Sequence, residues 1–247
     1  MVTIFVYNNI GVFISGRKII LGINDDTTLH GGDGDDHFIA WGDFNKAKQT
    51  FVNDPKRDVK FYGNGGNDKL VGAGGNDFLD GGSGDDTIFG YDGNDKIITG
   101  SGEDFVNAGN GDDEIIVNGA GLKHLYGGKG SDKFILNYMN LDSGIIINDF
   151  DLNDPNEVID LRAIKSLHSI KDFYQVFHHN MPLQHSSDPD LYRTDSRPEG
   201  MYQAVCLSSV KAEEAPNECW VALMGITKDQ ILSHPEKFLF SEMHDDL

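Results

Sequence analysis

Features typical of disulfide-stabilised, membrane-spanning and nucleic-acid-binding proteins are scarce in this sequence. Its 247 residues include only two cysteines, Cys206 and Cys219, too few for a disulfide scaffold; the pair is compatible with one disulfide or with two buried thiols. No apolar run approaches the ~18 residues of a membrane-spanning helix. Basic residues number 20 against 40 acidic ones, a net charge of −20. Such a surface repels nucleic acids and anionic membranes and attracts cations, so we expect no nucleic-acid partner and no membrane insertion.

Sequence signatures of catalysis and of export at the N-terminus are also missing. The zinc-protease motif H-E-x-x-H is absent, and so is the lipase motif G-x-S-x-G, which residues 81–85 fail at the last place. We therefore predict no catalytic residues and no enzyme. The start, MVTIFVYNNI, has neither a basic region nor a small-residue cleavage site and is typical of a strand. We expect no cleavable N-terminal export signal.

Glycine and aspartate are abundant and recur in consecutive nonapeptide blocks. Six blocks follow one another from Gly63 to Ile116, and two further blocks match at 31–39 and 127–135. Position four is glycine in all eight blocks, and position eight is always large and apolar. Position six is always aspartate: Asp36, Asp68, Asp77, Asp86, Asp95, Asp104, Asp113 and Asp132. A period kept over so many blocks predicts a repeat architecture.

Each position of the repeat has a physical reason. Glycine permits the positive φ of a tight turn and brings backbone carbonyls close to a cation, and a carboxylate supplies the hard oxygen that calcium prefers. The end of each block forms a short strand with the apolar side chain inward. One block gives a turn and a strand, so two blocks form one complete coil. Besides the eight aspartates, the candidate metal ligands are Gly63, Gly65, Gly72, Gly74, Gly81 and Gly90.

Loops two blocks apart are expected to stack, with Asp68 above Asp86 and Asp77 above Asp95. Without a cation, the rows of carboxylates would stand about 4.8 Å apart and oppose folding. The sequence therefore predicts a roll that is largely unfolded without calcium and folds when calcium binds. An acidic linker and a metal-free solenoid are the alternatives, but a linker has no reason to keep an apolar residue two places after each aspartate.

These blocks resemble the RTX (repeats-in-toxin) nonapeptide G-G-x-G-x-D-x-U-x. The resemblance covers about residues 31–135 and implies an all-β fold, a right-handed parallel β-roll loaded with calcium, with a β-rich C-terminal cap that contains minor helix. It also implies secretion from a Gram-negative bacterium by the type I secretion machinery, with an uncleaved C-terminal signal, as in toxins of the hemolysin type.

The chain departs from the pattern in two places. Residues 40–62 interrupt the register and are interpreted as a degenerate coil or hairpin, so that the loop at Asp36 would lack a proper partner. Val117 adds one residue, and the block at 118–126 has Lys123 where aspartate belongs. An ammonium group there would replace a cation, so the calcium row on that side should stop at Asp104. On the other side, Asp113 should still meet Asp132.

The flanks suggest three parts: an N-terminal cap over 1–62, the roll over 63–135 and a C-terminal cap with a secretion signal over 136–247. Residues 144–164 are similar to the segment that follows RTX repeats in secreted metalloproteases and alginate epimerases, which often holds one further calcium ion. That resemblance makes Asp149, Asp151, Asp154 and Asp160 candidate ligands. An EF-hand loop and a plain acidic strand end are alternatives, and the EF-hand pattern fails at its glycine and its glutamate. Residues 201–210 and 218–226 are predicted to form two strands, possibly a hairpin.

The sequence thus favours a calcium-binding module that folds outside the cell and supports the export and stability of a toxin, hydrolase or surface protein. We expect about five to seven calcium ions, each bound at roughly 10⁻⁴–10⁻³ M. One alternative is an adhesin that binds a glycan or a host protein through aromatic residues of the cap, namely Phe173, Tyr174, Phe177, Tyr192, Tyr202 and Trp220. Another is a polysaccharide-binding module that uses the basic residues at 46–60.

Overall fold

The computed structural model describes residues 12–13, 18–22, 27–41, 44–45, 50–51, 58–72, 74–138, 143–164, 169, 175–181, 202–208 and 220–241. For 12–13, 18–22, 27, 41, 44–45, 50–51, 143, 175–181, 202–208, 220 and 228, only the backbone is described.

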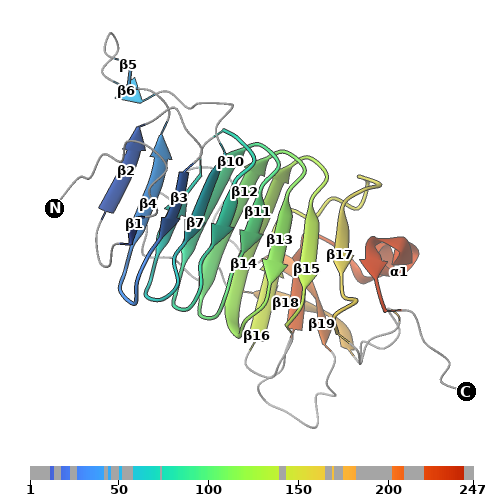
Figure 1. Cartoon of the computed structure of the whole chain (residues 1–247). Coiled ribbons are helices and arrows are strands. Elements are labelled where there is room, and N and C mark those ends of the chain that lie inside the picture. The colour runs from blue at the N-terminus through green and yellow to red at the C-terminus, as the bar shows by residue number, and fades with distance from the viewer. Residues whose placement is uncertain are drawn as a thin grey trace, which may run out of the picture.

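The described chain forms two long sheets that face each other across a narrow core (Figure 1). One sheet has the order β1-β3-β7-β9-β11-β13-β15-β17-β21, and all of its strand pairs are parallel. Its strands are β1 (Val12–Phe13), β3 (Thr27–His30), β7 (Val59–Tyr62), β9 (Phe78–Asp80), β11 (Lys96–Ile98), β13 (Glu114–Val117), β15 (Lys133–Leu136), β17 (Val158–Asp160) and β21 (Phe238–Leu239).

The second sheet has the order β18-β19-β20-β16-β14-β12-β10-β8-β4-β2 and is parallel from β20 to β2. Its strands are β2 (Lys18–Gly22), β4 (His37–Trp41), β8 (Lys69–Val71), β10 (Thr87–Asp92), β12 (Asp104–Asn110), β14 (Gly121–Lys129), β16 (Ser143–Ile147), β18 (Gln175–Met181), β19 (Tyr202–Ser208) and β20 (Trp220–Met224). From β7 to β17, successive strands alternate between the two sheets, as a roll requires. The predicted all-β parallel β-roll is confirmed.

The repeat period sets the register between neighbouring strands. Ile88 on β10 pairs with Leu70 on β8 and with Val106 on β12, the equivalent residues two blocks away in each direction. The coil becomes longer by a single residue where Ile115 pairs with Phe134, because the chain gains that residue at the end of β13. Two blocks therefore make one coil, as the sequence predicted.

A narrow layer of apolar side chains fills the space between the sheets. Each strand of the roll contributes one inward residue from position eight of its block, and these residues have no solvent exposure: Leu29, Phe38, Phe61, Leu70, Leu79, Ile88, Ile97, Val106, Ile115, Leu125 and Phe134. Fully burying such side chains contributes about 1.5–3 kcal/mol each. Some strands bury a second large apolar residue, such as Val59 on β7, Val117 on β13 and Leu136 on β15. The core is nevertheless thin, so the loops must contribute to the stability of the fold.

The interruption at 40–62 does not break the stacking of the coils. β4 pairs with β8, with His37 opposite Lys69, although the whole insertion separates them in the sequence. The extra chain includes a small antiparallel hairpin of β5 (Phe44–Asn45) and β6 (Thr50–Phe51). The expected hairpin is therefore present, but the expectation that the loop at Asp36 lacks a partner is wrong. β3 pairs with β7 and β4 pairs with β8, so the coil after the insertion still stacks on the coil before it.

The C-terminal segment continues both sheets and closes the end of the roll. β16 and β20 extend one sheet in parallel, and β19 pairs antiparallel with both β20 and β18. The predicted strands near 201–210 and 218–226 correspond to β19 and β20. Helix α1 (Lys228–Ser233) starts at a capping box between Thr227 and Gln230, buries Ile231, and precedes the 3₁₀ turn η2 (Pro235–Lys237). Among the described helices, none is long and apolar enough to cross a membrane.

Candidate metal sites along two rows of carboxylates

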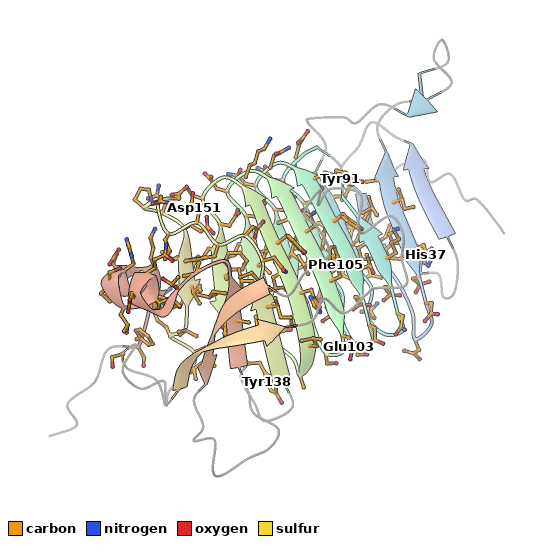
Figure 2. All side chains as sticks on the ribbon, turned by 180° about the vertical axis from the view of Figure 1, so that it is seen from behind. His37, Tyr91, Glu103, Phe105, Tyr138 and Asp151 are labelled. Carbon is orange, nitrogen blue, oxygen red and sulfur yellow. The ribbon has the colours of Figure 1, made fainter. Side chains whose placement is uncertain are left out.

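The aspartates at position six form two rows, one along each line of loops. The first row is Asp36, Asp68, Asp86 and Asp104, and the second row is Asp77, Asp95, Asp113 and Asp132. All eight are at most 2% exposed. In Figure 2, Glu103, next to the end of the first row, and Asp151, near the end of the second row, stand at opposite sides of the roll. Buried carboxylates in such numbers require partners or counter-charges.

From Asp68 onward, one oxygen of each row aspartate accepts a hydrogen bond from the loop of the preceding coil. The backbone N–H of Asp68 donates to Oδ1 of Asp86 at 2.8 Å, and the N–H of Asp86 donates to Oδ1 of Asp104 at 3.0 Å. The second row repeats this bond from Asp77 to Asp95 and from Asp95 to Asp113. It continues from Asp113 to Asp132 at 3.0 Å, as the sequence predicted. The carboxylates are therefore fixed in place by the stacking of the coils.

The other oxygen of these carboxylates is buried without a hydrogen bond. This holds for Oδ2 of Asp68, Asp86, Asp95 and Asp113. Oδ2 of Asp104 instead lies 2.7 Å from the ammonium nitrogen of Lys123. At Gly81, an added Cβ would overlap both Oδ2 of Asp86 and the carbonyl oxygen of Thr99 in the next coil. Carboxylate and carbonyl oxygens thus converge with no donor between them.

The predicted glycine ligands line the same places. The same arrangement is found at Gly63, Gly72 and Gly90. At each of them, an added Cβ would overlap Oδ2 of the aspartate in the same loop and a carbonyl oxygen of the next coil. The N–H of Gly65 donates to the carbonyl of Gly32 at 3.0 Å, and Gly74 is buried in its loop. Hard oxygens of these two kinds are the ligands that calcium takes in proteins, so the residues fit the ion that the repeat implies.

Burial makes the row carboxylates costly to ionise. Desolvation is the largest cause that raises the pKa of Asp86 and of Asp95 to about 8, and that of Asp68 and Asp113 to about 7. Neighbouring carboxylates of the same row raise these pKa values further. A cation between the loops would reverse both effects, because an opposite charge nearby favours the ionised form.

Glycine is required where the loops approach each other most closely. Gly84 has φ of +124°, and a Cβ there would overlap the carbonyl oxygen of Gly66 in the preceding coil. Gly102 has φ of +123° and lies in the same way over Gly84. A side chain at position four would separate the loops and with them the carboxylates.

Position five carries a second ladder that the sequence reasoning did not identify. The N–H of Asp85 donates to Oδ1 of Asn67 at 2.9 Å, and the N–H of Glu103 donates to Oδ1 of Asp85 at 2.8 Å. On the other line of loops, Asn94 bonds Asn76 in the same way. These side chains are exposed, and each accepts from the loop of the following coil, opposite to the direction of the row aspartates. The signal in the sequence was the recurrence of asparagine and aspartate directly before position six.

The second row is extended by Glu157, which sequence reasoning also missed. Lys133 pairs with Val158, so Glu157 lies in the coil after Asp132 at the place of position six. Glu157 is 3% exposed, and burial, followed by the charges of Asp132 and Asp149, raises its pKa to about 8. The available signal was its spacing, because Glu157 precedes the buried Ile159 by two residues, as each row aspartate precedes its apolar residue.

The four aspartates predicted as cap ligands divide into two groups. Asp149 accepts the N–H groups of Gly127 and Gly128 at 3.0 Å, and Asp154 accepts the hydroxyl of Ser131 at 2.8 Å. The N–H of Asp151 donates to Oε1 of Glu157 at 2.9 Å. These three aspartates therefore lie around the end of the second row.

Asp160 departs from this arrangement. Its carboxylate accepts from Arg162 and lies 3.4 Å from the Lys133 ammonium group, and the hydrogen bond from Arg162 lowers its pKa. Because two cations already engage Asp160, Glu157 and not Asp160 continues the row.

Side chains alone do not complete a site. Within the described ranges, no group of three or more histidine, cysteine, aspartate or glutamate side chains could hold a metal. Each inter-loop space has only two carboxylates, so backbone carbonyls must provide the remaining ligands.

The cysteine pair and the aromatic residues proposed for a glycan site lie outside the residues whose side chains the structure describes, as do the basic residues at 46–57.

Comparison with known proteins agrees with this geometry. Residues 21–44, 62–97 and 80–115 match the family model described as RTX calcium-binding nonapeptide repeat (4 copies). No curated protein and no solved structure matches the chain. The matched family is one of calcium-binding repeats and not a family of enzymes. The matched residues are therefore RTX calcium-binding nonapeptide repeats, and the two parallel sheets that they build form a β-roll.

Proposed function

We propose that this protein is a calcium-folded module of a secreted bacterial protein, in which ions bound between stacked loops hold the roll together outside the cell. The observation that carries the proposal is the row of buried Oδ2 atoms without hydrogen bonds at Asp68, Asp86, Asp95 and Asp113. Burying these negative charges against carbonyl oxygens destabilises the fold unless a cation lies between them.

The loops provide seven inter-loop spaces between consecutive acidic residues. Three belong to the first row from Asp36 to Asp104, and four belong to the second row from Asp77 through Asp132 to Glu157. This agrees with the five to seven ions expected from the sequence. The ligands proposed are the row aspartates, Glu157 and the backbone carbonyl oxygens of position one, such as those of Gly81, Thr99 and Ala108. Residues 63–135 form most of the metal-binding centre, and the flanks 1–62 and 136–247 add Asp36 and Glu157 at its two ends.

Secretion follows as part of the same proposal. At low cytosolic calcium the roll would stay unfolded because its carboxylates repel, and an unfolded chain suits a type I secretion machine. In millimolar extracellular calcium, ions fill the loops and the fold forms. The module would then stabilise a toxin, hydrolase or surface protein of a Gram-negative bacterium.

A calcium titration of the whole chain, followed by far-UV circular dichroism, tests the proposal. We expect a cooperative gain of β-signal between about 0.1 and 1 mM calcium, reversed by chelator. Magnesium at the same concentration should fail, because it requires near-octahedral geometry and gives up its water reluctantly. A chain that is fully folded in chelator and indifferent to calcium would overturn the proposal.

A further inference from the structure

The first row ends on a lysine, not on an aspartate. Asp104 pairs with Lys123 across β12 and β14, so Lys123 occupies position six of the next coil. Its side chain has no solvent exposure. The ammonium nitrogen lies 2.7 Å from Oδ2 of Asp104 and donates to the carbonyl oxygens of Gly102 at 2.7 Å and Ala120 at 3.0 Å.

The environment of this ammonium group has the composition of a calcium site. It consists of one row carboxylate and backbone carbonyls of two stacked loops. The same oxygen of Asp86, one coil earlier, has no hydrogen-bond partner.

We infer that Lys123 is a built-in cation, whose ammonium group takes the place of calcium between the loops of β12 and β14 and closes the first row without metal. This rests on the proposed function, since it presumes calcium in the other loops. The first row would then take its last ion between Asp86 and Asp104. The stacking of β14 on β12 would need no calcium on this side.

The strands on either side of the ammonium group fit this role. β12 has seven residues and β14 has nine, whereas β8, β9 and β11 have three each. Longer strands make more backbone hydrogen bonds between coils. The internal cation therefore lies beside the longest parallel pairing of the roll, with six paired positions between β12 and β14.

The second row ends near another buried lysine. The pairing of Ile159 with Phe238 places Lys237 opposite Val158, directly beyond Glu157. Lys237 is 2% exposed, and its ammonium group donates to the carbonyl oxygens of Asp154 and Glu157. An ammonium group bound to loop carbonyls thus stands at the C-terminal end of both rows.

Calcium counting on two matched variants of the whole chain tests the role of Lys123. Asp113 lies between Asp95 and Asp132 and borders two inter-loop spaces, so Asp113→Asn should remove two ions per chain. Asp104, equally buried at the same repeat position, has an aspartate on one side and a lysine on the other, so Asp104→Asn should remove one. Bound calcium is measured by equilibrium dialysis at a free concentration that just saturates the wild type.

The reciprocal variant restores an acidic ligand. Lys123→Asp should bind one calcium ion more than the wild type, whereas the exposed Lys129→Asp should leave the number unchanged. Equal losses in Asp104→Asn and Asp113→Asn, or a folded Lys123→Asp with no additional ion, would overturn the inference. If Lys123→Asp does not fold, the two asparagine variants decide. A wild type that binds no calcium would overturn the proposed function and this inference together.

Discussion

Acid should restore the roll when calcium is absent. Burial raises the pKa of five carboxyls to about 7 or 8, far above the unfolded value near 4: Asp68, Asp86, Asp95, Asp113 and Glu157. At pH values between the unfolded and the folded pKa, these carboxyls keep their protons in the folded chain and have lost them in the unfolded chain. Stability without calcium is therefore fully present below about pH 4 and is lost as pH rises through 7 to 8.

The expected effect is large relative to the stability of a protein domain. Each such carboxyl changes the free energy of unfolding by about 1.4 kcal/mol per pH unit, so five of them acting independently give up to about 7 kcal/mol per unit. A whole domain has only about 5–15 kcal/mol. Burial lowers the pKa of His124, which acts in the opposite direction, but it is one group against five.

The assay is circular dichroism of the protein in buffer stripped of calcium by a chelating resin, from pH 8 to pH 5.5. We expect β-signal to appear as the pH falls, and a matched series in saturating calcium to show no such gain. A calcium-free protein that is equally unfolded at both ends of the range, or better folded at pH 8, would refute the reasoning.

Three substitutions extend the account. Asp95→Asn keeps an oxygen for the Asp77 N–H but removes a buried charge; it should lower calcium affinity by tenfold or more while favouring the calcium-free fold by about 4 kcal/mol at pH 7. Its control is the exposed Asp85→Asn, which should change neither quantity appreciably in calorimetric and denaturant titrations. Gly102→Ala should lower the stability of the calcium-loaded protein in urea. Backbone strain at the positive φ costs about 1–3 kcal/mol, and the overlap of the added Cβ with the carbonyl oxygen of Gly84 adds to it. Gly225→Ala, with φ of +73° and no atom within 4 Å of its Cβ, should cost only about 1–2 kcal/mol. Glu157→Gln should reduce the bound calcium by one ion in equilibrium dialysis, and an unchanged number would exclude Glu157 as a ligand.

The repeat made most of the fold predictable. Each block specifies its own turn and strand, so Asp68, Asp86 and Asp104 could be stacked from the two-block period alone. The pairing of Asp113 with Asp132 followed after one inserted residue was allowed for. Lys123 could be recognised as an exception because aspartate fills the same position in all the matching blocks.

The rest depends on where the chain re-enters the roll. Asp36 meets Asp68 because β4 pairs with β8 across the insertion, and no local pattern reveals that pairing. Glu157 occupies its place because Val158 pairs with Lys133 at a separation in the sequence that the repeat does not specify. Asp160 seemed an equally good ligand in the sequence, but its pairing with Arg162 is visible only in three dimensions.

Amide hydrogen exchange read by mass spectrometry tests the central claim most directly, because it locates the calcium-dependent residues. With calcium, the N–H groups that link consecutive aspartates within a row, such as those of Asp68, Asp77 and Asp95, should be strongly protected. In chelator, or with magnesium alone, peptides across 63–135 should exchange as an unfolded chain does. Full protection of these peptides in chelator would contradict the account, because the buried carboxylates would then be stable without a metal.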